Sequence, residues 1–315
     1  MEGDIAGRPK VSIIIPSIGQ QPLLPPLVAS LVEGTKASIE IVVSHSAGSI
    51  PQGLGRSVVL LHQRAPLLAS AARNRGAERA RGQYLFFIDD DNSVEPGVVD
   101  VLASLLDRRP ELIEVGPAMY YAADPVRVYC LGASHRGMFS RTRWILQPPN
   151  DRAREIISDA LPNAFMVRRC DFEAIEGFDE VAFPMDFEES DLAFRLRQRH
   201  GGYLACSLDA RIWHHALISA RQRLAPKDLA RSYYSGRNRP IFIARHLGAR
   251  QWTEFVLMGQ FGVAVTKLWG VCFGPNETGR SRAIIGSAYL AGMVAGVFIS
   301  IGEFRQPLKS CMRNS

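Results

Sequence analysis

The sequence predicts an α/β protein, in which helices flank a mostly parallel twisted sheet. Apolar runs of four to six residues alternate with segments of helical spacing, which is typical of parallel strands joined by right-handed helical crossovers. Such runs contain few polar residues, as expected for strands that helices cover on both faces. The strands are predicted at 11–16, 39–43, 58–61 and 84–88, and the helices between them at 23–33 and 67–81.

Length and composition exclude fibrous and disordered proteins. The chain has 315 residues, of which 47% are hydrophobic and 22% charged, close to globular averages. At about 150 residues per domain, this length corresponds to two domains or one large one. The five cysteines include no close pair, so neither a zinc ribbon nor a disulfide framework is expected. The polar first ten residues lack an apolar signal core, and we expect the α/β part to stay in the reducing cytoplasm.

Charge is distributed unevenly along the chain. Residues 211–315 contain 15 Lys and Arg but only four acidic residues, whereas residues 1–210 contain 22 basic and 27 acidic residues. The basic part also contains long uncharged stretches. This combination fits an anionic membrane surface better than nucleic acid, because DNA-binding domains rarely need uncharged runs of twenty residues. We therefore expect a membrane partner and no nucleic acid.

The C-terminal region is predicted to be helical and to associate with a membrane. Residues 226–247 have the pattern of a long basic helix, and residues 255–274 are almost entirely apolar. Residues 283–302 carry no charge, and at about 1.5 Å per residue they match the roughly 30 Å hydrocarbon core of a bilayer. Gly292 and Gly296 form a GxxxG motif, which permits close helix contact. Because the segment is only moderately hydrophobic, a buried or interfacial hairpin stays open as an alternative.

Three consecutive aspartates follow the strand at 84–88. Asp89, Asp90 and Asp91 would repel one another unless water or a cation compensates their charge. Ligands bind at the carboxyl ends of parallel strands, and carboxylate oxygens suit Mg²⁺ or Mn²⁺. Alternation along an extended segment puts Asp89 and Asp91 on one side and Asp90 on the other. A solvated turn that caps the helix beginning near Pro96 is the alternative.

A second acidic cluster has four carboxylates within residues 186–191, at the start of a helix predicted over Glu188–His200. Carboxylates at a helix N-terminus are stabilised by the helix dipole, so capping is the simple explanation. Four acids exceed what capping requires, however. A carboxylate held near an acceptor hydroxyl could remove its proton during group transfer.

Histidines and arginines supply further candidates. His214 and His215 follow a strand-like run, where an imidazole could complete a metal shell or contact a phosphate, or could be purely structural. Arginine-rich segments at 72–76 and 235–239 suit diphosphate oxygens, or form exposed basic faces. P-loop, dinucleotide-binding, GxSxG and HExxH motifs are absent from the sequence.

Five segments of the chain stand in an order and spacing more specific than any single motif, and they cover roughly residues 10–245. The segments are VSIIIPS (11–17), ARNRGAERARGQYLFFIDDDN (72–92), FEESDLAFRLRQRHGGY (187–203), WHH (213–215) and YYSGRNR (233–239). Together they resemble the inverting glycosyltransferases of family 2, which have the GT-A fold. The processive QxxRW signature is missing, so the resemblance is to single-transfer enzymes of bacterial cell-surface polysaccharide synthesis.

The resemblance implies a nucleotide-diphospho-sugar donor, a glycan or lipid-linked acceptor, and Mg²⁺ or Mn²⁺ on the donor diphosphate. It implies metal contacts from Asp89, Asp91 and His214, with Asp91 the more direct ligand and Asp90 nearer the sugar or ribose. The residues expected to contact the nucleotide sugar are Pro16, Ser17, Ser44, Arg73, Asn74, Asp89, Asp90, Arg237 and Asn238.

The resemblance also implies a general base in the acidic cluster. The second acid of the family's "ED" element aligns with Glu189, while Glu188 is the alternative and Asp191 completes the catalytic set. One departure concerns the nucleobase, because Ser44-His45-Ser46 stands where the family usually has an acidic residue. Recognition of uracil by that carboxylate is therefore not expected, and the donor could carry another base.

We expect a GT-A catalytic domain over residues 1–215, with a nucleotide-sugar half at about 10–110 and an acceptor half at about 111–215. A basic helical segment would follow at 216–250, and an apolar membrane-associated region at 251–315. The expected location is the cytoplasmic face of the cell membrane. A sugar nucleotidyltransferase is an alternative, although the glycine-rich GxGxR-type loop is missing. A catalytically silent nucleotide-sugar-binding module attached to the membrane is another.

Overall fold

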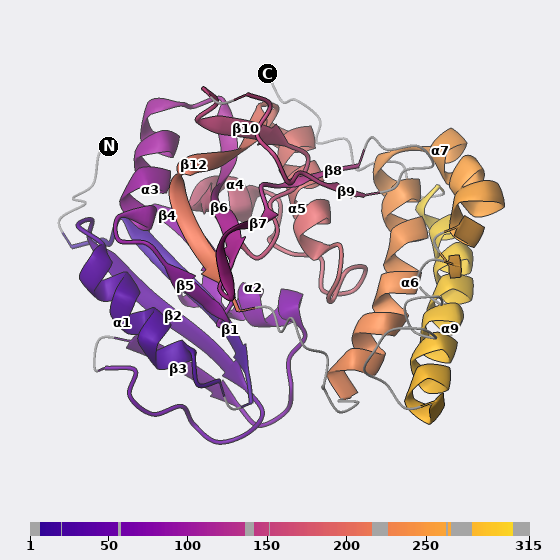
Figure 1. Ribbon diagram of the computed structural model, residues 1–315, viewed down its shortest axis with the longest axis horizontal. Helices are drawn as coiled ribbons and strands as arrows, with labels where there is room; N and C mark the ends of the chain where they lie inside the picture. The colour runs from indigo at the N-terminus through magenta and orange to yellow at the C-terminus, as the bar shows by residue number, and fades with distance from the viewer. Residues whose placement is uncertain are drawn as a thin grey trace. The chain divides into compact units, whose positions relative to one another are not determined.

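The computed structural model divides the chain into two units, each assembled from segments that are distant in sequence (Figure 1). The first unit contains Met1–Ser134, Trp144–Asp179 and Leu192–Ala216, and the second contains His135–Arg143, Glu180–Asp191 and Leu217–Ser315. The domain boundaries expected from the sequence stay a prediction. The structure describes residues 7–19, 21–55, 58–135, 142–150, 152–215, 226–262, 264–265 and 279–304.

The first unit is built on a ten-stranded sheet. Eight of its strands have the order β10-β12-β6-β11-β4-β1-β2-β3, and the other two, β5 and β7, pair with β12 and β6. The strands are β1 Val11–Ile18, β2 Ile39–Ser46, β3 Val58–Gln63, β4 Tyr84–Ile88, β5 Asn92–Val94, β6 Leu112–Tyr121, β7 Asp124–Cys130, β8 Ala133–Ser134, β9 Arg143–Trp144, β10 Glu155–Ser158, β11 Ala164–Arg168 and β12 Tyr203–His214. The helices of both units together are α1 Leu24–Gly34, α2 Ala69–Arg79, α3 Val98–Arg108, α4 Arg169–Ala174, α5 Glu188–His200, α6 Pro226–His246, α7 Ala249–Glu254, the π-helix η2 Phe255–Gly259 and α9 Gly279–Glu303.

The sheet is mostly parallel, as predicted. Strands β3, β2, β1 and β4 pair in parallel, and so do β6 and β12. Strand β11 lies antiparallel between β4 and β6. The predicted α/β class with helices flanking a mostly parallel sheet is therefore confirmed, and the carboxyl ends of β1, β2, β3 and β4 lie at one edge, where ligands bind in such folds.

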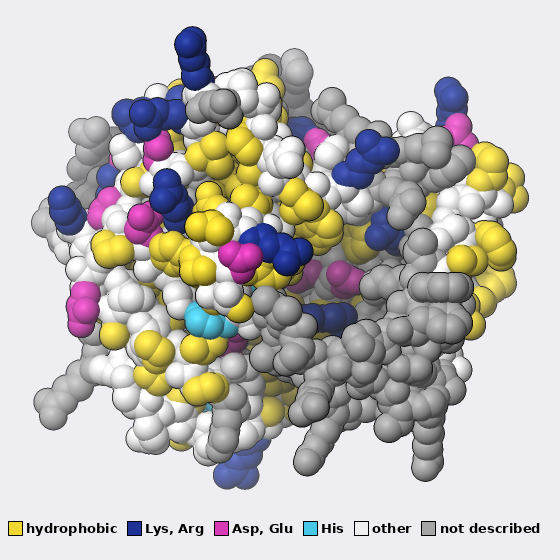
Figure 2. All heavy atoms as spheres, viewed as in Figure 1, with side chains coloured by type: hydrophobic (Ala, Val, Ile, Leu, Met, Phe, Trp, Pro, Cys, Tyr) yellow, Lys and Arg dark blue, Asp and Glu magenta, His cyan; other side chains and the backbone are white. Residues whose placement is uncertain are grey.

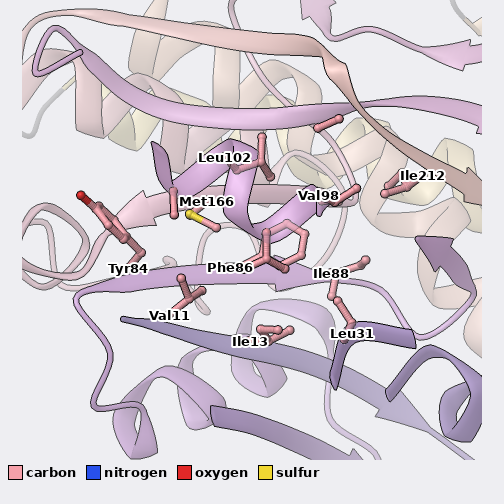
Figure 3. Packing of buried hydrophobic residues seen from close by; sticks show 14 of the residues in the cluster. Val11, Ile13, Leu31, Tyr84, Phe86, Ile88, Val98, Leu102, Met166 and Ile212 are labelled. Carbon is pink, nitrogen blue, oxygen red and sulfur yellow. The ribbon is translucent and has the colours of Figure 1, made fainter. Parts of the chain in front are cut away.

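Alternate side chains of the central strands enter two separate cores. From β1 and β4, Ile13 and Phe86 point into the core that Leu31 and Leu102 also enter from α1 and α3 (Figure 3). The next residue along β4, Phe87, packs on the opposite face against Phe165, Phe172 and Phe178. This explains why the strands read as continuous apolar runs, since both faces are covered.

The structure contains strands that the sequence pattern did not predict. Strand β6 is buried over its first eight residues, but its Gly116-Pro117 pair interrupts the strand signal in the sequence. Gly116 is required because a Cβ there would lie 2.8 Å from the carbonyl oxygen of Ala164 on β11. Strand β12 is also longer than the predicted 210–212. A register shift between Ser207 and Arg211 places a polar bulge inside the strand, and this bulge interrupts the apolar pattern in the sequence.

One buried carboxylate links the start of β1 to the end of α2. Glu40 accepts hydrogen bonds from the Ser12 hydroxyl, at 2.6 Å, and from the backbone and side chain of Arg81. Burial alone would raise the pKa of Glu40, but these donors outweigh it and hold the pKa below its ordinary value. The charged carboxylate therefore stabilises the amino-terminal edge of the sheet, opposite the edge where ligands are expected.

In the second unit, the basic helix α6 packs closely on the apolar helix α9. The sequence predicted a helix close to each, at 226–247 and 283–302. Part of the predicted apolar stretch 255–274 forms η2, and the remainder from residue 266 lies outside the described residues. Within the described residues, the segment Ile284–Glu303 is the one helix long and apolar enough to cross a bilayer, and about a third of its most apolar window is buried inside the protein.

Glycines make the close approach of α6 and α9 possible. A Cβ at Gly292 would overlap the carbonyl oxygen of Tyr233, and one at Gly296 would overlap the carbonyl oxygen of Arg237. The predicted GxxxG motif therefore acts in helix packing, but against a basic helix of the same chain. Small residues at this spacing let two helix backbones touch.

Gly292→Ala should destabilise the second unit by about 1–3 kcal/mol, because the added methyl group forces α9 away from α6. Gly302→Ala is the matched control on the same helix, since a Cβ there meets no atom within 4 Å. Alanine favours helix by up to about 1 kcal/mol over glycine, so this control should be neutral or stabilising. Thermal unfolding of both variants tests the contact, and equal melting temperatures would contradict it.

Candidate functional site

The first of the aspartates after β4 pairs with a basic side chain of the first unit. Arg73 projects from α2, is buried, and places its guanidinium 2.9 Å from Asp89 Oδ1. Its Cζ also lies 5.6 Å from the centre of the Phe178 ring, which restricts the side chain. Asp90 is buried beside it in sequence, at 8% exposure. Arg73 and Asp89 thus form a direct ion pair, and the expected contacts of both residues with the nucleotide sugar stay a prediction.

Asp91 lies beside His214 because β5 pairs with the end of β12. The register sets Asn92 opposite His214, and the His215 amide donates to the Asp91 carbonyl oxygen at 2.8 Å. Asp91 Oδ1 and His214 Nδ1 are 3.3 Å apart. Among the described residues, His214 Nδ1 makes no hydrogen bond. The ring of Tyr129 packs edge-on against the imidazole, with centroids 4.8 Å apart.

This pair fits two ligands of one divalent ion. Ligands at right angles around Mg²⁺, each about 2.1 Å from it, would be about 3 Å apart. No group of three or more His, Cys, Asp or Glu side chains in the described part of the chain could hold an ion by itself. Mg²⁺ commonly takes one or two carboxylates and completes its shell with substrate phosphates and water. Asp91 and His214 are close enough to share an ion, whereas Asp89 contacts Arg73. The metal roles of all three residues stay predictions.

Polar side chains also cluster at the carboxyl ends of β1, β2 and β3. Parallel pairing sets Pro16 opposite Ser44 and Ser17 opposite His45. His45 lies 3.3 Å from the Ser17 hydroxyl and stacks on His62 of β3, with ring centroids 5.4 Å apart. Burial lowers the pKa of His45, so the ring is neutral at pH 7.

The sequence pattern did not indicate this histidine pair. Ser44-His45-Ser46 stood out only as the replacement of an acidic residue. His62 gave no motif, but its position on the neighbouring parallel strand could have indicated the contact. The Ser44 side chain is buried, and its hydroxyl has no hydrogen-bond partner among the described residues.

Asn74 contacts the backbone of the first unit. Its amide donates to the Phe178 carbonyl oxygen and accepts from the Phe178 amide, both at 2.9 Å. These two bonds join α2 to the segment after α4. A contact between Asn74 and the nucleotide sugar stays a prediction.

The second acidic cluster lies at the start of α5, in the second unit. Asp191 is fully buried, and its Oδ1 lies 2.8 Å from His246 Nε2 and 3.2 Å from Arg245 on α6. Glu188 is buried and Glu189 is partly exposed. A general base must reach a substrate, so accessibility favours Glu189 over the other two acids. The contacts of Asp191 indicate that it joins α5 to α6.

The backbone immediately before these acids has an unusual conformation. Asp186 and Phe187 have φ angles of +64° and +73°, in the left-handed region. Such conformations cost non-glycine residues about 1–2 kcal/mol each, and two in succession persist only where neighbouring contacts hold them. They set the direction in which the chain enters α5.

Arg237 and Asn238 of α6 contact the segment that precedes α5. Arg237 donates to the carbonyl oxygens of Ala182, at 2.7 Å, and Val181, at 3.3 Å. Asn238 is fully buried and donates to the carbonyl oxygens of Met185 and Asp186. The expected nucleotide contacts of Arg237 and Asn238 stay a prediction.

Comparisons with known proteins agree with this architecture. The chain is 28% identical over 240 residues to the O-antigen biosynthesis protein RfbC of Myxococcus xanthus, covering 71% of this chain and 18% of that protein. It is 30% identical over 129 residues to an uncharacterized glycosyltransferase, EpsJ, of Bacillus subtilis, covering 38% of this chain and 37% of that protein. It therefore spans well under half the length of these relatives.

A solved structure shows a similar fold. The crystal structure of GalNAc-T7 with UDP, GalNAc and Mn²⁺ superposes with a TM-score of 0.56 at 14% identity, covering 76% of this chain and 50% of that one. The family model described as Glycosyl transferase family 2 matches residues 12–169, half of the chain, including β1, the acidic end of β4 and β11. With the strand-end acids, Arg73 and the parallel sheet in place, the chain belongs to glycosyl transferase family 2.

Proposed function

We propose that this chain transfers one sugar, with inversion, from a nucleotide-diphospho-sugar to a hydroxyl of a glycan or lipid-linked acceptor. The observation that carries the proposal is the arrangement of Arg73, Asp89, Asp91 and His214 at the carboxyl end of β4. Family membership supports the reaction class and disfavours a nucleotidyltransferase. Similarity to RfbC, an O-antigen biosynthesis protein, supports a place in cell-surface polysaccharide synthesis.

The donor would bind at the end of β4, where Arg73 pairs with Asp89 and His214 lies beside Asp91. A bound Mg²⁺ or Mn²⁺ would compensate the charge that develops on the leaving diphosphate. Asp91 and His214 would hold that ion, and the Mn²⁺ in the GalNAc-T7 structure supports a divalent requirement. Arg73 pairs with Asp89 and orients its carboxylate. The nucleobase would lie near Ser17, Ser44 and His45, and Ser44-His45-Ser46 stands where the family usually has an acidic residue.

Glu189 would act as the general base. In an inverting transfer the acceptor oxygen attacks the anomeric carbon while the bond to the diphosphate breaks. A Glu189 carboxylate oxygen would accept the hydroxyl proton as that bond forms. The partial exposure of Glu189 supports this role, whereas Asp191 is engaged with His246 and Arg245.

Membrane attachment is proposed for the second unit. Large apolar side chains of η2, the following turn and α9 are exposed, among them Leu257 at 74%, Phe261 at 76% and Phe298 at 71%. Figure 2 shows hydrophobic side chains gathered over α7 and α9. Because the other face of α9 packs on a helix rich in arginine, we propose that the exposed face binds the cytoplasmic membrane surface peripherally.

Asp91→Asn should raise the Mn²⁺ concentration needed for half-maximal turnover by at least about tenfold, because one charged ligand is lost. His214→Ala should act in the same direction. Asp209→Asn, an exposed acid paired with Arg154, is the control and should leave the requirement unchanged. Metal titrations of activity, with free Mn²⁺ binding followed by electron paramagnetic resonance, test this; unaltered Mn²⁺ affinity in Asp91→Asn would remove the proposed site.

Glu189→Gln should lower kcat by about 10²–10⁴-fold while donor binding is retained, because the amide cannot accept the acceptor proton. Glu173→Gln, an exposed acid on α4, should behave as wild type. Single-turnover transfer and calorimetric donor binding measure the two quantities. Wild-type protein that binds donor without any turnover would instead favour the silent binding module.

The double variant Phe261→Asp/Phe298→Asp should no longer float with vesicles of phosphatidylcholine and phosphatidylglycerol, because two carboxylates enter the apolar face. Val126→Asp, which is 86% exposed on β7 of the first unit, is the control and should still float. Flotation of the double variant together with the control, or wild-type protein that never floats, would exclude this membrane-binding face.

A further inference from the structure

We propose that Asn238 is a positioning residue that fixes the backbone before α5 and thereby sets the placement of Glu189. This inference rests on the proposed role of Glu189 as the base. It assigns Asn238 a role other than the nucleotide contact that the family resemblance implies. The contacts that carry it all lie within the second unit.

Every polar atom of the Asn238 amide is used. Its Nδ2 group donates to the carbonyl oxygens of Met185, at 2.8 Å, and Asp186, at 2.7 Å. Its Oδ1 accepts from the Arg237 guanidinium at 2.6 Å. Carbonyls only accept and guanidinium only donates, so this amide orientation is the one that satisfies all three partners. Asn238 is fully buried, so water cannot replace these bonds.

The two carbonyls belong to the strained part of the backbone. The Met185 carbonyl belongs to the peptide unit that precedes Asp186, and the Asp186 carbonyl belongs to the unit between the two left-handed residues, Asp186 and Phe187. Glu188 follows as the first residue of α5, so Glu189 is three residues from the second carbonyl. Non-glycine residues hold such angles only when their surroundings determine them, and the two hydrogen bonds from Asn238 meet that requirement.

Other α6 side chains hold the same segment on either side. The ring of Phe187 contacts the Arg239 guanidinium, 5.0 Å away, and the Phe242 ring, 5.3 Å away. His246, two turns beyond Asn238, contacts Asp191 in the first turn of α5. Side chains of α6 thus contact the chain at several points between Val181 and Asp191. Asn238 makes the contact next to the left-handed residues.

Asn238→Asp separates positioning from packing. The side chain keeps its size, but the two donors are replaced by an acceptor that faces the same two carbonyls. We expect kcat to fall at least about tenfold, while binding of UDP or GDP with Mn²⁺ stays within about twofold of wild type. We also expect faster amide hydrogen exchange in a peptide covering 185–191. Exchange in a peptide covering β4 should not change.

A second-site change should restore the rate. Glycine adopts a φ of +64° without strain, so Asp186→Gly in the Asn238→Asp background removes part of the need for the lost hydrogen bonds. The double variant should recover to within about threefold of the wild-type kcat. Arg231→Ala, at an exposed position of the same helix, is the control for changes in α6. If Asn238→Asp does not fold, Asn238→Ser takes its place, because it shortens the side chain without adding charge.

The outcomes are distinct. Weaker nucleotide binding with unchanged exchange at 185–191 would overturn the inference and assign Asn238 to the donor site. Normal kcat in Asn238→Asp, or no recovery in the double variant, would also overturn it. Absence of turnover in the wild type would refute the proposed function instead, and the exchange measurement would still decide whether Asn238 fixes the segment.

Discussion

Repulsion among three carboxylates at the end of one strand is the constraint around which the first unit is arranged. Apolar packing on both faces of β4 requires Asp89, Asp90 and Asp91 to emerge together at its carboxyl end. Arg73 compensates the first, and His214 approaches the third without forming a hydrogen bond. In the proposed function, a divalent ion and a donor diphosphate would bind beside Asp91 and His214.

The second unit solves a different problem, that of holding a strained chain segment at the start of α5. Helix α6 supplies the contacts, through Arg237, Asn238, Arg239, Phe242 and His246. Helix α9 in turn packs on α6 through glycines that permit backbone contact, so the apolar C-terminal helix supports the helix that holds the acidic segment. The proposed membrane-binding face and the segment that carries the proposed base Glu189 would then both depend on the packing of α6.

Several elements of the fold could be predicted from the sequence. The continuous apolar runs predicted β1 and β4 closely, and the acidic start and the Gly-Gly end predicted α5, because these signals are local. Strand β6 was missed because Gly116-Pro117, which its packing requires, breaks the local pattern. The contacts of Asp191 with His246 and of Asn238 with Met185 could not be predicted, since they join residues more than fifty positions apart and leave no periodic signal.

The proposed sugar transfer depends on a donor diphosphate that binds the first unit through a divalent ion. Titration calorimetry of UDP-, GDP- and dTDP-sugars, in Mn²⁺ and again in excess EDTA, tests this most directly. We expect at least one nucleotide sugar to bind with one-to-one stoichiometry in Mn²⁺ and to lose at least about tenfold in affinity in EDTA. Equal affinity in both buffers, or no binding of any donor, would contradict the account.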